Sequence, residues 1–456
     1  MAKQFKKTKL TTAVSIAAVS LGLSATADAV VVVGGDNGWE VSFDGNINAF
    51  YTLTDYDAGF TTLGYTTPGA GGFGSAATIA TTPAYDSARV TSGYMPAFFS
   101  FNVKSPTVNG LTATGRISFA PVIQNGNSKN QFYRGVNDNS ADVRGSLGGG
   151  IQGSGLDTRE VVVNVEGDFG TFSFGRTLSI FGRQAMLKDQ TLFGVGAPNQ
   201  QSGSITAGRT GRGYTYPNFN ARFSYKTPNI GGIQAEVGLY DPSVEQNPFN
   251  TNAGQLLNET DTPRFEGELS YTTTFSTGSF QVWMDGMWQD IESSQQGASG
   301  DVTVAAVGFG ADMKMDGFNV LGYYYTGQGL GRSLQFVGGT RCEANGVNCQ
   351  EADNDGYYVQ GSYSFNGKTK IATSYGQSTE EGFGAINADG LNVQAMAATQ
   401  DVELNMWTIG VYHDMTSWMK MVAEYSNLEN EYKRTTTLSS GKTEADVFSL
   451  GAFLFW

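Results

Sequence analysis

The sequence predicts an all-β fold: a transmembrane, antiparallel, up-and-down β-barrel of about 16 strands. Three observations predict it. Strand-length segments alternate apolar and polar residues, and short and long connections alternate between them. After the N-terminal segment, no apolar run approaches the twenty or so residues that a membrane-spanning helix needs. The composition agrees, with Gly 61, Tyr 21, Phe 29, 15% charged residues and a mean hydropathy of −0.24.

Residues 1–29 have the pattern of a signal peptide. The first ten residues carry four lysines, residues 10–25 are mostly apolar, Ser and Thr, and Ala27-Asp28-Ala29 gives a small-x-small cleavage site. The alternative, a retained anchor, needs a longer and less interrupted apolar run. Cleavage would leave residues 30–456 as one barrel domain. It would change the net charge from −14 to −17, because the signal carries four Lys and one Asp. Such acidity argues against a nucleic-acid partner.

Period-two alternation marks the strands. In the first, Val41, Phe43, Ile47, Ala49 and Tyr51 share one face, and Ser42, Asp44, Asn46 and Asn48 share the other. A strand with one apolar and one polar face is half buried. The predicted strands are 39–56, 94–104, 111–120, 158–166, 171–176, 213–226, 232–240, 263–275, 279–290, 301–313, 317–327, 355–365, 368–378, 401–413, 418–428 and 444–456.

The connections alternate in length. The short ones, such as 314–316 and 366–367, are rich in Pro, Gly, Asn, Asp, Ser and Thr, which supply the dihedral angles of tight turns. The long ones are 57–93, 121–157, 177–212, 241–262, 291–300, 328–354, 379–400 and 429–443. Tight periplasmic turns and extended outer loops are typical of a membrane barrel. In hydrocarbon an open sheet edge is costly, so the first and last strands are expected to pair.

Aromatic residues near strand ends suggest the girdles of such a barrel. They are Tyr51, Trp288, Trp407, Trp418, Tyr425 and Trp456. The single histidine, His413, shares the apolar face of its strand, which makes it a rim residue rather than a catalytic base. Cys342 and Cys349 predict a disulfide that staples a loop, with zinc binding as the weaker alternative. The acidic run 351–355 is a solvated segment or, less readily, a divalent-cation site.

Two resemblances extend these predictions. The last eight residues, with Ser449, Gly451, Leu454 and Trp456, resemble the C-terminal assembly signal of bacterial outer-membrane proteins, although Phe is the commoner last residue. This implies recognition by the barrel-assembly machinery. The mature chain also resembles the Gram-negative general porins, in its strand number and in Phe174-Gly175-Arg176 at the end of the fifth strand.

The porin resemblance implies a homotrimer, with loop 121–157 latching a neighbour. It also implies that the loop at about 177–212 folds into the barrel and constricts the pore. That loop here has a net charge of +3, inside an acidic chain. We expect either an anion-favouring constriction or cations that pair with acidic wall residues and hold the loop in place. The predicted constriction residues are Arg176, Arg183, Lys188, Asp189, Arg209 and Arg212.

Parity with apolar neighbours assigns further charged residues to the lumen. The predicted pore wall comprises Arg116, Arg222, Arg264, Glu266 and Glu268, together with Asp44, Lys226 and Glu236. The directions of Arg176 and Arg159, which lie at strand ends, are open. A water-filled lumen of this kind works through its diameter and its lining charges.

The predicted function is therefore passive diffusion of small hydrophilic solutes and ions across the bacterial outer membrane. The expected partners are outer-membrane lipid, lipopolysaccharide and solutes, with no cofactor and no metal. The main alternative is an eighteen-stranded, substrate-selective channel for sugars or organic acids, with Tyr214, Tyr216, Tyr240 and Tyr358 as candidate lumen aromatics. An outer-membrane enzyme and a plugged adhesin or receptor barrel are more distant alternatives.

Overall fold

The structure is a computed structural model, and it describes residues 30–34, 37–58, 84–121, 123, 156–198, 206–243, 257–293, 301–337, 339–341, 349–381, 400–434 and 441–456. The predicted signal peptide, residues 1–29, lies outside the described residues, as do Cys342 and most of loop 121–157. Among the described residues, no helix is long and apolar enough to cross a membrane.

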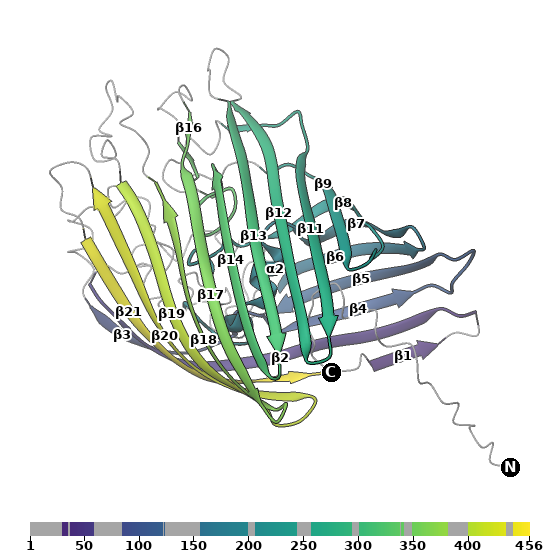
Figure 1. Ribbon diagram of the computed structural model, residues 1–456, viewed down its shortest axis with the longest axis horizontal. Helices are drawn as coiled ribbons and strands as arrows, with labels where there is room; N and C mark the ends of the chain where they lie inside the picture. The colour runs from purple at the N-terminus through teal and green to yellow at the C-terminus, as the bar shows by residue number, and fades with distance from the viewer. Residues whose placement is uncertain are drawn as a thin grey trace.

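The chain forms a closed antiparallel barrel of 16 strands (Figure 1). The wall consists of β2 (Glu40–Tyr56), β3 (Tyr85–Thr91) with β4 (Phe98–Lys104) as one interrupted strand, β5 (Thr112–Pro121), β6 (Leu156–Gly167), β7 (Gly170–Leu178), β8 (Phe219–Lys226), β9 (Ile233–Tyr240), β11 (Arg264–Phe275), β12 (Gly278–Ser293), β13 (Val302–Met315), β14 (Phe318–Gln328), β17 (Asp353–Phe365), β18 (Thr369–Glu380), β19 (Gln400–Asp414), β20 (Met419–Arg434) and β21 (Gly441–Phe455). The predicted strand number is confirmed, and the eighteen-stranded alternative is wrong.

Smaller elements accompany the wall. Strand β1 (Val30–Gly34) pairs with the start of β2, β10 (Leu257–Glu259) adds to the end of β12, and β15 (Thr340–Arg341) pairs with β16 (Gln350–Glu351). Helix α2 (Arg183–Lys188) and the 3-10 helix η1 (Gln190–Phe193) follow β7. In Figure 1, α2 lies behind the wall formed by β11 to β14.

Pairing between β2 and β21 closes the barrel. Asn46 to Tyr56 of β2 pair with Phe455 back to Ala445 of β21. Gly45 and Trp456 then exchange both backbone hydrogen bonds at 3.2 Å. On the outer face the indole of Trp456 packs against two rings, with centroid distances of 5.6 Å to Phe43 and 5.3 Å to Phe99. The predicted pairing of the first and last strands is therefore confirmed.

The short connections are built from residues that accept positive φ. Three contain the pairs Asn109-Gly110, Asp316-Gly317 and Asn366-Gly367, in which both residues have φ between 48° and 86°. Such pairs form the primed turns whose twist matches that of antiparallel strands. The alternation of tight turns with long loops predicted from the sequence is confirmed.

The predicted strand 418–428 is too short, because β20 continues to Arg434. Two further predicted boundaries are wrong because the chain turns inward. The predicted strand 94–104 begins earlier, at Tyr85, and is broken at residues 92–97, where Tyr94 N and Met95 N donate to Gly194 O and Leu192 O inside the barrel. The predicted strand 213–226 begins only at Phe219, because residues 213–218 belong to the interior. In both places the chain bonds with distant segments instead of a neighbouring strand.

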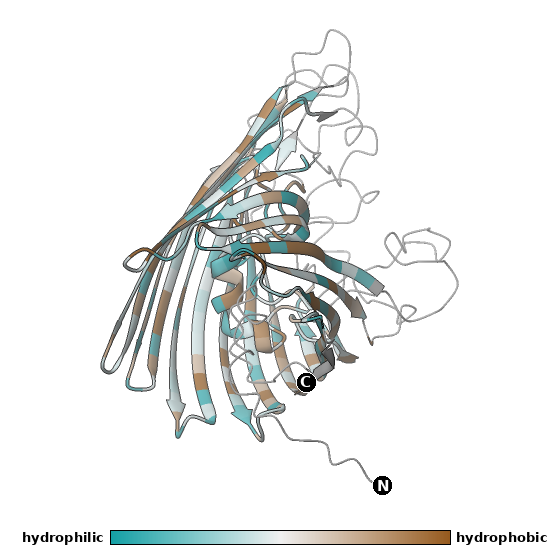
Figure 2. Cartoon of the chain, turned by 90° about the vertical axis from the view of Figure 1, so that its right-hand side faces the viewer, coloured by the Kyte–Doolittle hydropathy of each residue, from teal (hydrophilic) through white to brown (hydrophobic). Residues whose placement is uncertain are grey.

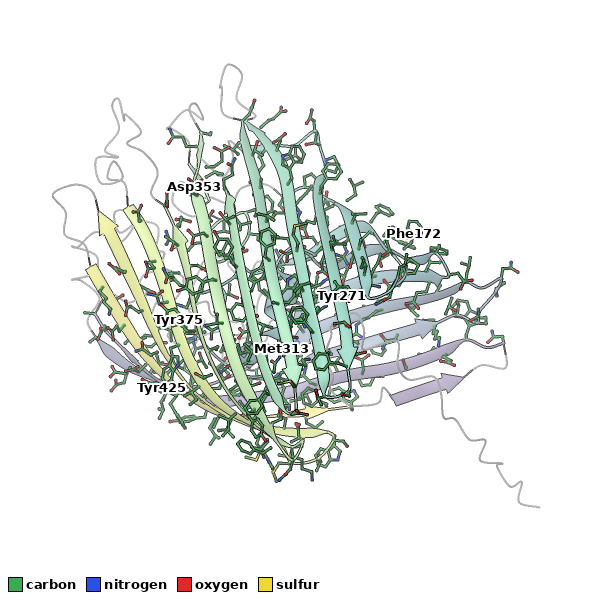
Figure 3. All side chains as sticks on the ribbon, viewed as in Figure 1. Phe172, Tyr271, Met313, Asp353, Tyr375 and Tyr425 are labelled. Carbon is green, nitrogen blue, oxygen red and sulfur yellow. The ribbon has the colours of Figure 1, made fainter. Side chains whose placement is uncertain are left out.

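The two faces of the wall differ as the alternation predicts, and Figure 2 shows apolar and polar residues alternating along the strands. Large apolar side chains point outward, where lipid would cover them; Phe172, Tyr271, Met313 and Tyr375 are examples (Figure 3). Most of the predicted girdle residues are exposed outward as well. The buried side chains lie inside the barrel, and many of them are polar or charged.

Candidate functional site

The segment between β7 and β8, residues 179–218, turns into the barrel, and we call it the inward loop. It carries α2 and η1, and residues 199–205 lie outside the described residues. Its side chains Ile180, Phe181 and Ala185 are at most 1% exposed. The inward course of the loop at 177–212, which the family resemblance implied, is therefore present in this chain.

Wall carboxylates bind the backbone where the inward loop begins. Glu266 Oε2 accepts from Ile180 N at 2.7 Å and from Phe181 N at 2.9 Å. Asp285 Oδ2 accepts from Gly182 N at 2.9 Å. Gly182 has φ 77°, a left-handed conformation that glycine adopts without strain. This first anchor joins the loop to β11 and β12.

A second anchor lies on the far side of the lumen. Gln190 N donates to Gln360 Oε1 at 2.6 Å, on β17. Glu424 Oε2 on β20 accepts from Val195 N at 2.6 Å and from Gly196 N at 3.2 Å. Hydrogen bonds to a carboxylate are the stronger kind. The inward loop therefore spans the barrel between two anchors instead of hanging from its ends.

The cations of α2 are paired with the wall. Arg183 Nη2 lies 2.8 Å from Glu236 and 3.4 Å from Glu268, and Lys188 Nζ lies 2.7 Å from Asp312. Of the two readings left open by the sequence, these contacts support the one in which the cations hold the loop in place.

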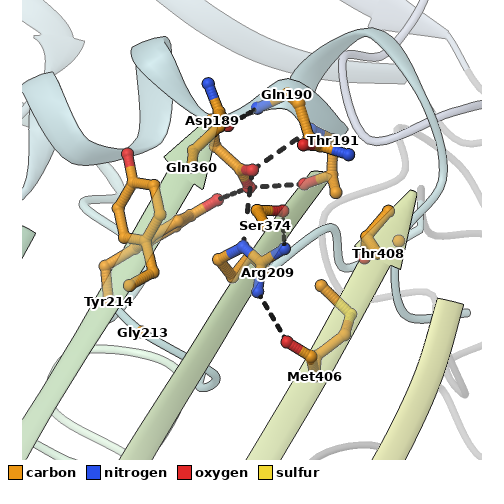
Figure 4. A network of polar contacts seen from close by, with 12 residues as sticks. Asp189, Gln190, Thr191, Arg209, Gly213, Tyr214, Gln360, Ser374, Met406 and Thr408 are labelled. Carbon is orange, nitrogen blue, oxygen red and sulfur yellow. Dashed lines mark hydrogen bonds and ion pairs between the residues drawn. The ribbon is translucent and has the colours of Figure 1, made fainter. Parts of the chain in front are cut away.

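Arg209 and Asp189 form a buried network inside the loop (Figure 4). Arg209 Nε lies 3.5 Å from Asp189 Oδ1, and Arg209 Nη1 donates to Met406 O at 3.0 Å. Tyr214 donates its hydroxyl to Asp189 Oδ2 at 2.9 Å. Burial raises the pKa of Tyr214 well above its ordinary value, so the phenol keeps the proton that it donates.

Arg212 is also fully buried. Its guanidinium donates to the carbonyl oxygens of Asn405 and Glu429 at 2.6 and 3.0 Å and to Asn430 Oδ1 at 2.7 Å. Arg209 and Arg212 thus contact protein atoms and not an open passage, whereas Asp189, although 2% exposed, borders the wide cavity described below.

Arg176 was predicted at the constriction, and that prediction is wrong. On β7 the exposed residues are Phe172, Phe174 and Arg176, which share the outer face. The strand keeps its period of two up to Arg176, so the side chain points away from the lumen.

The predicted pore-wall residues point inward, but they are paired. Arg116 binds Asp44 at 2.8 Å and Glu160 at 2.7 Å. Arg264 Nε lies 3.2 Å from Glu266 Oε1, and Arg222 Nη2 lies 3.1 Å from Glu236 Oε1. Arg159, whose direction was open, also points inward, donating to the Tyr216 hydroxyl at 2.9 Å.

The candidate lumen aromatics do not form an open line. Tyr214, Tyr240 and Tyr358 are at most 2% exposed, and Tyr358 donates to Ala185 O at 2.6 Å. Tyr240 supports Ile180 N, Arg222 and Arg264. These rings hold the inward loop and the wall cations, so a sugar-binding track along them is not supported.

Sequence reasoning missed several contributors. Asp285, Asp312 and Glu424 anchor the loop, and only their inward parity could have marked them. A second missed feature is the segment 329–352, whose described part packs on the inward loop: Tyr216 N donates to Ser333 O at 2.8 Å. Arg332 of this segment pairs with Glu380 of β18, both almost fully buried.

Two cavities flank the inward loop. A narrow one of about 60 Å³ lies between the loop and the wall of β4 to β6, lined by Leu187, Leu192, Arg159 and Glu160 among others. A wide one of about 750 Å³ lies between the loop and the short turns. Leu187 lines both cavities, so it lies at the boundary between them.

Other predicted sites remain predictions. Cys349 is described but Cys342 is not, so the disulfide between them stays a prediction. His413 lies at the end of β19 with its Nδ1 2.8 Å from Thr369 Oγ1. In the part of the chain that the structure describes, no group of three or more His, Cys, Asp or Glu is placed to hold a metal ion.

A closed barrel of 16 strands, apolar outside and charged inside, with a loop anchored across its lumen, defines a membrane channel of the porin class. Comparison with known families agrees: the model of the family described as Gram-negative porin matches residues 11–433. The chain belongs to the Gram-negative porin family and is a protein of the bacterial outer membrane. Family and fold indicate a channel rather than an enzyme.

Solved structures show the same fold at low sequence identity. The outer membrane channel DcaP of Acinetobacter baumannii is 14% identical, with a TM-score of 0.58, over 94% of this chain and 100% of that one. An anion-selective porin from Comamonas acidovorans is 11% identical, with a TM-score of 0.54, over 92% and 100% of the two chains. Among curated protein sequences no match is found.

Proposed function

We propose that this protein is a passive diffusion channel for small hydrophilic solutes and ions, and that it has no catalytic activity. The observation that carries the proposal is the inward loop, anchored at both sides of the lumen by Glu266, Asp285 and Glu424. A loop held in this way narrows a water-filled barrel but leaves it open, because the loop stays fixed to the wall. No energy source is needed for diffusion through such an opening.

The narrowest part of the proposed route runs between the inward loop and the wall of β4 to β6. The small cavity there is lined by apolar loop residues, Leu187 and Leu192, and by the charged pair of neighbours Arg159 and Glu160 on β6. From it the route would continue past Leu187 into the wide cavity above the short turns. Its size limit would therefore depend on apolar side chains of the loop.

We further propose that the constriction discriminates weakly between anions and cations. The loop cations that suggested an anion preference, Arg183 and Lys188, are neutralised by Glu236, Glu268 and Asp312. The anion selectivity of the Comamonas porin belongs to that protein, whose likeness to this chain is in fold.

Planar-bilayer recordings of the purified protein test these points. We expect a stable conductance in KCl and a reversal potential close to zero across a KCl gradient. Leu187→Ala should increase the uptake of sugars near the size limit in liposome-swelling assays, whereas Leu450→Ala, on the outer face, should not. A protein without conductance would exclude the channel, and a saturable uptake of one sugar would favour a selective one.

We also propose a homotrimer, assembled in lipid and lipopolysaccharide with the help of the barrel-assembly machinery. Support comes from the resemblance of the chain to the Gram-negative general porins, which implies a trimer. Light scattering of the detergent-solubilised protein, with the detergent mass subtracted, would distinguish three copies from one.

A further inference from the structure

The wide cavity on the turn side of the inward loop has its own chemistry, and we call it the vestibule. Its volume is about 750 Å³. The loop contributes Leu187, Lys188 and Phe193 to its lining, and the short turns at 276–277, 316–317, 366–368 and 415–418 surround its mouth. A solute that passes the constriction would therefore enter the vestibule before it leaves the barrel.

Lysines are concentrated in the vestibule of this acidic protein. Five line it, and four aspartates line it with them; the lysines are Lys188, Lys314, Lys368, Lys370 and Lys420. Most of these aspartates are already paired with a cation. Asp312 pairs with Lys188 and Lys314, Asp414 with Lys420, and Asp189 with Arg209. The vestibule therefore has an excess of positive charge.

Lys370 supplies that excess at a defined place. It is the second residue of β18, beside the turn, and points inward on the same face as Ala372 and Ser374. Among the described residues its ammonium group makes no hydrogen bond and no ion pair; it lies 4.6 Å from the centroid of the Tyr412 ring. Tyr412 in turn donates to Glu424 at 2.5 Å, so the ring under Lys370 is held in place. A positioned ammonium without an anionic partner favours an anion from solution.

Aromatic rings lie next to these lysines. Phe193 of η1 and Phe455 of β21 both line the vestibule, with ring centroids 6.3 Å apart. Lys420 lies 5.4 Å from the centroid of Phe193. The lysine charge and the apolar ring surface are thus neighbours, an arrangement that fits a ligand with one anionic end and one flat apolar end.

We propose that the vestibule binds small aromatic carboxylates, with Lys370 and Lys420 facing the carboxylate and Phe193 and Phe455 facing the ring. This inference rests on the proposed channel function and names a solute class for it. The site lies on the route through the barrel, so binding there would hold such a solute briefly and reduce the current carried by smaller ions.

Single-channel recording with benzoate as the probe tests the site. The full-length protein is inserted in a planar bilayer in KCl, and benzoate is added on the side of the short turns. We expect benzoate to reduce the current in a saturable manner, at lower concentration than acetate, which lacks the ring, or benzyl alcohol, which lacks the charge. Lys370→Met should raise the half-blocking concentration about tenfold, the equivalent of about 1.4 kcal/mol, and Lys370→Arg should restore most of the block.

Lys104→Met is the matched control. Lys104 ends β4 at the same end of the barrel but does not line the vestibule, so benzoate block should be unchanged. Each variant is first shown to insert into the bilayer and conduct KCl, which establishes that it folds, and block is measured relative to the variant's own open current. Conductance without benzoate block, or block that is equal in Lys370→Met, would overturn the inference and leave the channel function standing. The absence of any conductance would overturn both.

Discussion

Replacing Glu424 with leucine is expected to loosen the second anchor of the inward loop. Glu424 Oε2 accepts hydrogen bonds from Val195 N and Gly196 N, and Tyr412 donates to its other oxygen. Leucine keeps much of the side-chain volume but accepts nothing. The backbone groups of Val195 and Gly196 would then lose their acceptor, at about 1–3 kcal/mol for each buried group.

Loss of the acceptor for both backbone groups would therefore cost about 2–6 kcal/mol in total. We take the low end, because detachment of the loop would expose the freed groups to water in the lumen. A loss of about 2 kcal/mol changes the ratio of detached to attached loop by about 30-fold. We therefore expect frequent brief closures and excess noise in the open-channel current of Glu424→Leu.

Single-channel recordings at constant voltage measure the closing frequency directly. Glu429→Gln is the control on the same strand: its side chain pairs with Lys442 on the outer face and not with the loop. If Glu424→Leu closes no more often than the unaltered protein, the carboxylate does not hold the loop, and the anchoring argument fails.

Four further substitutions test other parts of the structure. Asp312→Asn should free the charge of Lys188 and shift the reversal potential in a KCl gradient towards anion preference; an unchanged potential would show that the pair lies off the ion path. Phe309→Arg, in the middle of the outer face of β13, should destabilise the barrel by about 2–4 kcal/mol in bilayers. Met315→Arg, at the end of the same strand, should cost about 0–1 kcal/mol, and urea titrations would show whether the depth dependence holds. Trp456→Ala removes two ring contacts worth about 0.5–1.5 kcal/mol each, so a smaller folded fraction is expected on unheated gels; full folding would contradict a role in closure.

The wall could be predicted from the sequence because its determinants are local. In β11 the alternation can be read from consecutive residues. Phe265 and Leu269 point outward, and Glu266 and Glu268 point inward. The turn at Asn366-Gly367 is likewise a two-residue signal. Most strand ends were predicted to within a few residues where both neighbours in space were neighbours in sequence, although β20 extends to Arg434, past the predicted end at residue 428.

The interior could not be predicted in the same way, because its contacts join distant segments. Tyr214 and Tyr216 alternate as a strand would, yet they bind Asp189 and Ser333 inside the barrel. The net charge of the inward loop can be read from its residues, but the partners of those charges cannot: Lys188 and Asp312 are 124 residues apart. Whether a lumen cation faces solute or a carboxylate is decided by such pairings alone.

Strand β1 restricts the register in which β21 can pair with β2 when the barrel closes. On one edge of β2, Val30 lies opposite Phe43 and Trp456 lies opposite Gly45, so a single residue, Asp44, separates the two strands that share this edge. A shift of β21 by two residues towards the turn side would therefore displace β1, and a shift by one would turn every side chain of β21 to the wrong face. A five-residue hairpin arm thus limits the shear of the whole barrel, and with it the diameter of the lumen.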